Sequence, residues 1–274
     1  MTPPPPAYLH TPTGTRIAYR DEHPPHPAPL PPFLLLHGLA GHMGEWNDLA
    51  THLLSAGHRV IRYDAAGHGT STRTPPDMSR EAATADAVAL LTTLETGPVV
   101  LLGQSLGGLT ALVTAAAHPA LVEALILIEA GPAAAAPDLP DKIGAWLDSW
   151  PSPFPSYEDA VAFLGHPAWA DGLNWHPDGT GHPRVDRDTM TAAVREPATR
   201  DYWKEWTHLR CPTLVVRGAQ GTMPASDPPE MRSRRPSNTH ITVIPNAGHD
   251  VHLDQPAELY GAITEFLNSP RSNG

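Results

Sequence analysis

Residues 99–117 read VVLLGQSLGGLTALVTAAA, a short apolar run followed at once by Gly-x-Ser-x-Gly and then by a longer helix-forming stretch. The run Val99–Gly103 has the length of a buried strand, and Leu106–Ala117 has the length of a helix. At a strand-to-helix turn this motif lifts the serine hydroxyl clear of the sheet. The helix N-terminus adds free N–H groups and partial positive charge beside that oxygen. The stretch therefore predicts that Ser105 is a nucleophile.

Short apolar runs and helices alternate on both sides of this stretch, which predicts an α/β fold with a mostly parallel central sheet flanked by helices. Such a sheet is buried on both faces, so its strands read as continuous apolar runs. Two N-terminal strands, Ala7–His10 and Arg16–Arg20, flank turn residues and predict a hairpin. The other strands are predicted at Phe33–Leu36, Arg59–Tyr63, Leu125–Ile128, Thr213–Val216 and Ile241–Ile244, and the other helices at Glu45–Ala56, Ser79–Leu94, Pro228–Arg235 and Pro256–Leu267.

The segment 137–210 breaks the alternation, because prolines and glycines divide it into short helices. It holds six of the chain's seven tryptophans, and ligand pockets are mostly apolar with a few polar groups. We predict an inserted helical cap, or lid, over a pocket at 137–210, with the α/β core formed by 1–136 and 211–274. The tryptophans predicted to line the pocket are Trp146, Trp150, Trp175, Trp203 and Trp206 in the cap and Trp46 in the core.

The composition argues against several classes of protein. The chain has 274 residues, of which 41% are hydrophobic and 17% charged, as is typical of a globular chain. Its 18 lysines and arginines against 29 aspartates and glutamates, a formal charge of −11, argue against nucleic-acid binding. The single cysteine leaves no internal disulfide, no apolar run has the length of a membrane span, and no signal-peptide pattern opens the chain. We expect a cytoplasmic protein with a small-molecule substrate, no nucleic-acid or membrane partner, and an oligomeric state that the sequence leaves open.

A histidine near the C-terminus can serve as the base that Ser105 needs. A serine hydroxyl is a weak nucleophile until a base takes its proton, and imidazole suits that task near neutral pH. His249 follows a strand that ends at Ile244, which places it at the carboxyl edge of the sheet, where such sites lie. Although His252 is close in sequence, no third group of ligands accompanies the two histidines, so we predict no metal.

The chain resembles the α/β-hydrolase superfamily, in particular its capped serine esterases and lactonases. The resemblance covers nearly the whole chain and rests on the Ser105 motif, His37-Gly38-Leu39, Asp64–Ser71 and Asn246-Ala247-Gly248-His249-Asp250. It implies an α/β-hydrolase fold that uses no cofactor, with Ser105 as nucleophile and His249 as base. It also implies an oxyanion hole built from the backbone N–H groups of Leu39 and Leu106, with His37 as a structural brace.

The acid of the triad departs from the family pattern. The family's aspartate is expected three or four residues after Gly218, where this sequence has Gly221 or Thr222. Glu129 ends the strand Leu125–Ile128, and some lactonases and dehalogenases of this superfamily take their acid from that strand end. Glutamate reaches further than aspartate, and a carboxylate at the end of an apolar run needs a partner, so we predict Glu129 as the acid. The alternatives are Asp227, which could instead cap a helix, Asp250, and a dyad without an acid.

These residues predict a serine hydrolase that cleaves a carboxylic ester or lactone of a bulky apolar or aromatic substrate through an acyl-enzyme. Cleavage of a carbon–carbon bond next to a ketone, on the same triad, is the first alternative. A pocket side chain that holds a substrate carboxylate or enolate would favour it, with Arg187, Arg195 and Asn174 as candidates. The second alternative is a non-catalytic, ligand-binding homologue, which only the missing aspartate supports.

Overall fold

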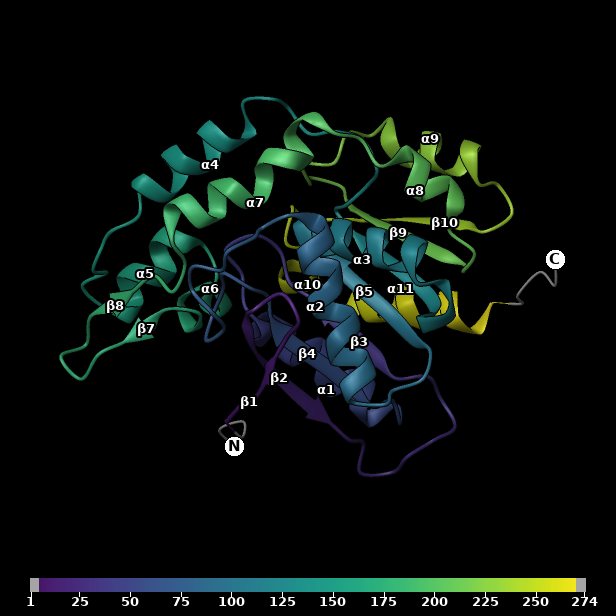
Figure 1. Cartoon of the computed structure of the whole chain (residues 1–274), viewed down its shortest axis with the longest axis horizontal. Helices are drawn as coiled ribbons and strands as arrows, with labels where there is room; N and C mark the ends of the chain where they lie inside the picture. The colour runs from purple at the N-terminus through teal and green to yellow at the C-terminus, as the bar shows by residue number, and fades with distance from the viewer. Residues whose placement is uncertain (1–4, 270–274) are drawn as a thin grey trace.

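The computed structural model describes residues 5–269, and a mixed eight-stranded sheet forms the centre of that part of the chain (Figure 1). Its order is β1-β2-β4-β3-β5-β6-β9-β10. Every pairing from β4 to β10 is parallel, and β2 is antiparallel to both of its neighbours. The strands are β1 (Ala7–His10), β2 (Arg16–Glu22), β3 (Phe33–Leu36), β4 (Val60–Asp64), β5 (Val99–Gln104), β6 (Val122–Ile128), β9 (Thr213–Gly218) and β10 (Thr239–Ile244).

Both faces of the sheet are apolar and covered by helices. Successive strand residues point to opposite faces, so Leu34 and Leu101 lie in one apolar cluster, and Phe33 and Val100 lie in the other. The predicted α/β architecture with a mostly parallel sheet is therefore confirmed. One face packs against α2 (Arg80–Thr93), α3 (Ser105–Ala117), α8 (Trp203–His208) and α9 (Asp227–Arg234), and the other against α1 (Asn47–Ser55) and α11 (Pro256–Asn268).

The predicted helix Glu45–Ala56 differs from the structure at its start. It consists of a 3-10 turn, η1 (Met43–Trp46), followed by α1. The turn forms because the Glu45 carboxylate accepts a hydrogen bond from the backbone N–H of His42 while the His42 ring caps Gly44. Two further short helices, η2 (Pro119–Leu121) and α10 (Val251–Asp254), were not predicted, because such short elements carry no periodic signal.

Residues 137–210, which we call the insert, lie between β6 and β9 in the chain. In Figure 1, α4 and α7 of the insert lie side by side across the top of the core. The insert has a small apolar cluster of its own around Trp150 and Phe154. Among residues 5–269, no helix is both long and apolar enough to cross a bilayer. The elements of the insert are α4 (Leu139–Asp148), α5 (Tyr157–Leu164), α6 (Pro167–Asp171), an unpredicted hairpin of β7 (Asn174–Trp175) and β8 (Gly181–His182), α7 (Arg187–Thr199) and α8.

Candidate active site

The turn between β5 and α3 carries Ser105 at the first position of the helix. Its φ of 51° lies in the left-handed region, which a residue other than glycine adopts only under strain. A side chain at Gly107 would collide with the backbone carbonyls of His37 and Leu36, and one at Gly103 would collide with the carbonyl of Gly107. The two glycines therefore let α3 pack against β3 and β5 closely enough to hold this turn.

Ser105, His249 and Glu129 all line one cavity of about 560 Å³ at the carboxyl edge of the sheet. The His249 ring is partly exposed to this cavity, and the Glu129 side chain is fully buried behind it. The structure thus brings together three residues from the ends of β5, β6 and β10, which lie far apart in the sequence.

The Glu129 carboxylate contacts the Nδ1 atom of the His249 ring. Its Oε2 lies 3.3 Å from His249 Nδ1 and also accepts the backbone N–H groups of Thr222 (2.7 Å) and Met223 (2.9 Å). Its Oε1 accepts the N–H of Gly218 at 2.8 Å. Burial raises the pKa of Glu129, but the hydrogen bonds from His249, Met223 and Gly218 outweigh it and hold the pKa below its usual range. The carboxylate is therefore ionised near neutral pH.

Glu129 occupies the space that a side chain at Gly221 would need. A Cβ atom built on Gly221 would collide with the Glu129 carboxylate. The family pattern was expected to place its aspartate at position 221 or 222, and the Glu129 carboxylate occupies the space beside Gly221 from the neighbouring strand. Asp227 is held instead at the start of α9, where it hydrogen-bonds Ser226 at 3.2 Å, and burial raises its pKa.

Thr222 also contacts the histidine, and the sequence carried no signal for it. Its Oγ1 lies 2.8 Å from His249 Nδ1 and 3.4 Å from Glu129 Oε2. A hydroxyl can accept the Nδ1–H and donate to the carboxylate at the same time. Thr222 is therefore placed to bridge the imidazole and its acid.

Leu39 and Leu106, the predicted oxyanion donors, both line the cavity beside Ser105. Leu106 is in the first turn of α3, where backbone N–H groups have no partner within the helix. The loop that carries Leu39 is fixed by buried His37, whose Nδ1 donates to the carbonyl of Gly38 (2.8 Å) and whose Nε2 accepts the N–H of Ala65 (3.0 Å). Burial lowers the pKa of His37, which keeps its ring neutral for this bracing role.

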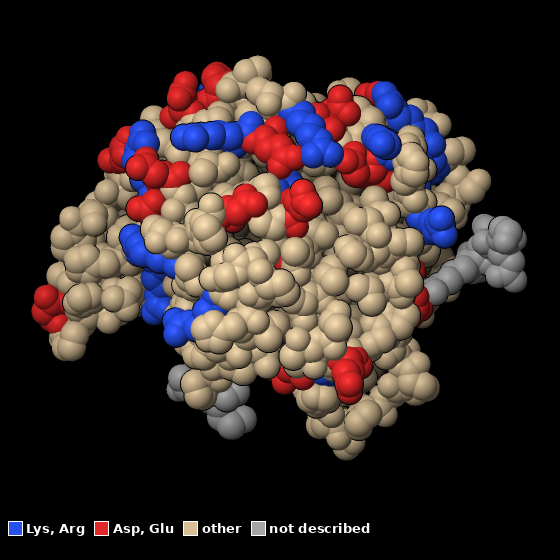
Figure 2. Space-filling model, viewed as in Figure 1, with Lys and Arg blue, Asp and Glu red and all other residues tan. Residues whose placement is uncertain are grey.

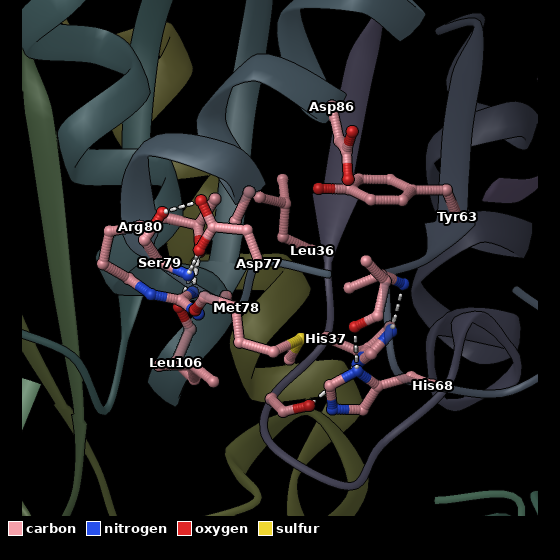
Figure 3. A pocket seen from close by; sticks show the side chains of 16 residues that line it. Leu36, His37, Tyr63, His68, Asp77, Met78, Ser79, Arg80, Asp86 and Leu106 are labelled. Carbon is pink, nitrogen blue, oxygen red and sulfur yellow. Dashed lines mark hydrogen bonds between the residues drawn. The ribbon is translucent and has the colours of Figure 1, made fainter. Parts of the chain in front are cut away.

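A second, small cavity of about 40 Å³ lies behind this loop (Figure 3). Leu106 and Gly38 line both cavities, so a thin wall of backbone separates them. Figure 3 shows His37 and His68 on one side of the small cavity and Arg80 on the other. Burial, with a contribution from His37, lowers the pKa of His68 to about 3, so the wall behind the oxyanion loop carries neutral imidazoles.

The apolar wall of the catalytic cavity differs from the predicted one. The insert supplies Trp146 from α4, as predicted, and Trp169 from α6, which was not predicted. Trp169 donates its indole N–H to Asp250 Oδ2 at 3.0 Å, and Gln104 Nε2 donates to Asp250 Oδ1 at 3.2 Å. Asp250, an alternative acid, is thus directed toward the insert rather than toward the His249 ring. Further apolar lining includes Leu109, Leu139, Ile143, Val194 and Pro197.

Five predicted pocket tryptophans do not line the cavity. Trp46 and Trp206 are fully buried in the core, where Trp46 packs on His252 and the Trp206 N–H donates to Met231 O at 3.0 Å. Trp203 packs against the guanidinium of Arg234, whose Cζ atom lies 3.9 Å from the centroid of the Trp203 ring. Trp150 and Trp175 pack within the insert's own apolar cluster. The prediction was wrong for these five residues because each ring has a packing partner that the sequence does not reveal.

The charge of the cavity lining is acidic. None of the described residues that line it is a lysine or an arginine, whereas Glu45, Glu129 and Asp250 are carboxylates. Arg187 and Asn174, the candidates for holding a substrate carboxylate, line a different groove. Arg195 lines neither this groove nor the cavity that contains Ser105. The geometry thus gives no support to a site that holds an anionic substrate group.

The chain belongs to the alpha/beta hydrolase family, whose model matches residues 33–262. The sn-1-specific diacylglycerol lipase ABHD11 of Mus musculus is 32% identical over 257 residues, which cover 88% of this chain and 82% of the mouse protein. The crystal structure of E-2-(acetamidomethylene)succinate hydrolase superposes with a TM-score of 0.83 at 22% identity, covering 96% of this chain and 99% of that one. The enol-lactonase of Burkholderia xenovorans superposes with a TM-score of 0.76 at 20% identity, covering 96% of this chain and 100% of the lactonase chain. These relatives are hydrolases, and the α/β-hydrolase fold predicted from the motifs is confirmed.

Proposed function

We propose that the protein is a serine hydrolase that cleaves a carboxylic ester or lactone through an acyl-enzyme and needs no cofactor. The observation that carries the proposal is the single cavity that Ser105 and His249 share, with the Glu129 carboxylate 3.3 Å from His249 Nδ1. This is the arrangement of a nucleophile, a base and the acid that orients the base.

Each residue has a defined task in this mechanism. Glu129 and Thr222 hold the proton of His249 on Nδ1, which leaves Nε2 free to take the proton of the Ser105 hydroxyl. The serine oxygen attacks the carbonyl carbon, and the N–H groups of Leu39 and Leu106 stabilise the oxyanion. His249 then returns the proton to the leaving alkoxide, and the alcohol departs. Water, deprotonated by the same histidine, attacks the acyl-enzyme and releases the acid; in a lactone, alcohol and acid remain one molecule.

The lining of the cavity supports a neutral, apolar substrate. Trp146 and Trp169 offer aromatic surface, and Leu139 and Ile143 extend it. Three carboxylates and no arginine or lysine disfavour a substrate that carries its own carboxylate. A neutral ester is also the substrate class in the name of the mouse relative, a diacylglycerol lipase.

We also propose that the insert acts as the cap of the site. Its α4 contributes Leu139, Ile143 and Trp146 to the cavity, and α7 contributes Val194 and Pro197. These side chains face the nucleophile from the side opposite the sheet, so a substrate has to lie between the insert and the core. Water is excluded from the reacting carbonyl when the space is filled.

The proposal is tested with a fluorophosphonate probe and a panel of neutral esters, lactones and diketones, on the wild type and on Ser105→Ala. We expect the probe to label the wild type alone and esters or lactones to be hydrolysed by the wild type alone. The panel includes phenyl acetate and para-acetoxybenzoate, which differ by one carboxylate, and the neutral ester should be preferred. Turnover of diketones alone would support carbon–carbon cleavage, and labelling without any turnover would support a ligand-binding homologue.

A further inference from the structure

A second groove, of about 580 Å³, lies between the insert and the core, separate from the catalytic cavity. Among the described residues, none lines both. The core contributes Gly69 and Arg73 from the loop after β4, and the insert contributes residues of the β7–β8 hairpin and its flanks. A ligand in this groove would therefore touch both parts of the molecule.

The groove is basic although the whole chain carries a formal charge of −11. Three arginines line it, together with His176 and His182, whose ring centroids lie 4.5 Å apart with the planes tilted by 41°. Figure 2 shows basic side chains gathered between the lobe that holds β7 and β8 and the core. The arginines of the groove are Arg73, Arg184 and Arg187.

Two of these arginines already have partners. Arg187 donates to Asp148 at 2.7 Å and to Asp188 at 3.3 Å, so its charge is balanced. Arg73 donates to the backbone carbonyls of Pro183 (3.0 Å) and Val185 (2.8 Å), which fixes its guanidinium against the insert. Those carbonyls are neutral. Asp186 lies near Arg73, but its Oδ1 already accepts hydrogen bonds from the backbone N–H and the hydroxyl of Thr189. These hydrogen bonds lower the pKa of Asp186, and the charge of Arg73 lowers it further.

Arg184 is the unusual member of the group. Its Nε is buried, and within residues 5–269 the structure gives its side chain no hydrogen bond, ion pair or aromatic contact. Burying a guanidinium donor without an acceptor destabilises a protein, because the donor loses its hydrogen bond to water and gains nothing in return. The rest of the guanidinium also has no hydrogen-bond partner among the described residues and the side chain lines the groove, so an acceptor placed there can bond it.

We propose that this groove binds a phosphate group, with Arg184 as its principal ligand. The groove offers the Arg184 guanidinium, the hydroxyl of Ser152 and the imidazole of His182, while the Asn174 amide and His176 Nε2 are hydrogen-bonded to each other at 3.1 Å. These donors come from separate segments of the insert, and a phosphate offers three or four oxygens that can accept hydrogen bonds from different directions. Arginine is also the side chain whose planar fork matches a phosphate. The phosphate belongs either to a free ester or to an anionic lipid headgroup.

The test is isothermal titration of inorganic phosphate and glycerol phosphate into the wild type, Arg184→Gln and Arg187→Gln. Arg187→Gln is the matched control, because that arginine lines the same groove but is already paired. We expect saturable binding by the wild type in the millimolar range or tighter, binding weaker by about tenfold or more in Arg184→Gln, and a change within about twofold in Arg187→Gln. No saturable binding, or equal binding by the wild type and Arg184→Gln, would overturn the proposal.

Sedimentation with vesicles separates the two sources of the phosphate. Vesicles of phosphatidylcholine alone and with phosphatidic acid are compared. Binding to the mixed vesicles that Arg184→Gln removes assigns the site to a lipid headgroup, and binding of glycerol phosphate alone assigns it to a soluble ester. If Arg184→Gln does not fold by circular dichroism, Arg184→Lys replaces it, because lysine keeps the charge but lacks the Nε donor. An unchanged dissociation constant in Arg184→Lys would then contradict the proposal.

Discussion

Glu129 and Gly221 form a pair at the scale of single residues. They lie at the ends of neighbouring strands, and the carboxylate of one fills the space left by the missing side chain of the other. Glu129 has a φ of 49°, so its backbone is also held in a conformation that non-glycine residues seldom adopt. Strain of this kind persists where the surroundings fix the residue, here through three backbone N–H donors to its carboxylate.

Replacing Glu129 by glutamine should lower kcat by roughly 10³–10⁴, because a neutral amide can hold His249 in the wrong tautomer. Asp227→Asn is the matched control, and it should change kcat by no more than a few-fold through a weakened helix start. Steady-state kinetics on a neutral ester measures both. A large loss in Asp227→Asn with little loss in Glu129→Gln would assign the acid to Asp227.

The acid should be transferable to the ordinary family position. Glu129→Gly removes the carboxylate that blocks position 221, and Gly221→Asp then supplies one from the neighbouring strand. We expect the double variant to recover at least about tenfold in kcat over Glu129→Gly, since the histidine regains an anionic partner. Gly221→Asp alone should be destabilised by the collision and by two adjacent carboxylates. A double variant no more active than Glu129→Gly would show that the position is not equivalent.

Glu129 also links stability to pH. Burial raises its pKa, but the hydrogen bonds from His249, Met223 and Gly218 lower it below its ordinary value near 4.5. A carboxyl with a depressed folded pKa adds stability above its unfolded pKa and loses it as the pH falls through the folded pKa. The difference in unfolding free energy between the wild type and Glu129→Gln should therefore be full above the ordinary pKa near 4.5 and shrink as the pH falls below it through the folded pKa. Chemical denaturation checks this, and a difference that persists at the lower pH would contradict it.

Among the secondary-structure elements of the insert, the element that carries a tryptophan determines whether its ring lines the cavity or packs inside the insert. Trp146 is on α4, whose Leu139 and Ile143 face the same cavity, so the ring belongs to the wall. Trp175 is on β7 and donates its N–H to Ala170 O at 3.0 Å inside the insert. The two residues have the same side chain in the same segment, but only one faces the nucleophile.

Trp146→Ala should lower kcat/KM for bulky aromatic esters by about tenfold or more, because an aromatic ring of this kind buries roughly 150–250 Å². The value for a small acetate ester should change less. Trp175→Ala should lower the melting temperature and leave the ratio of the two esters unchanged in the folded protein. Equal selectivity in the wild type and Trp146→Ala would show that α4 is not part of the substrate wall.

The strands and the strand-to-helix turn that carries Ser105 were predictable because they depend on local patterns. Val99–Gly103 is a short apolar run, and Ser105 stands in a motif that only a tight strand-to-helix turn uses. The contact between Glu129 and His249 was predictable from the resemblance and from the isolated carboxylate at the end of β6. The tryptophans that line the cavity were not predictable, because residues 137–210 hold six tryptophans. No periodic pattern there distinguishes rings that line a pocket from rings that pack inside the insert. Trp169 is on a helix of five residues, which carries no such signal.

At the scale of the whole molecule, the sheet determines where chemistry can occur. Parallel strands deliver their last residues to one edge, and α4 and α7 cover that edge (Figure 1). The acidic cavity and the basic groove share no lining residue among those described, and a third, small space is lined by Trp169 of the cavity and by Trp150 and Arg184 of the groove. We predict that the reaction in the acidic cavity passes through a covalent intermediate on Ser105.

Intact-protein mass spectrometry of samples quenched during turnover of a neutral ester tests this claim most directly. We predict a species heavier by the acyl group, with the adduct mapped by proteolysis to the peptide that contains Ser105. It should accumulate further when the reaction is quenched early, and it should be absent from Ser105→Ala. Steady product formation by the wild type with no acyl adduct, or with an adduct on another residue, would contradict the account.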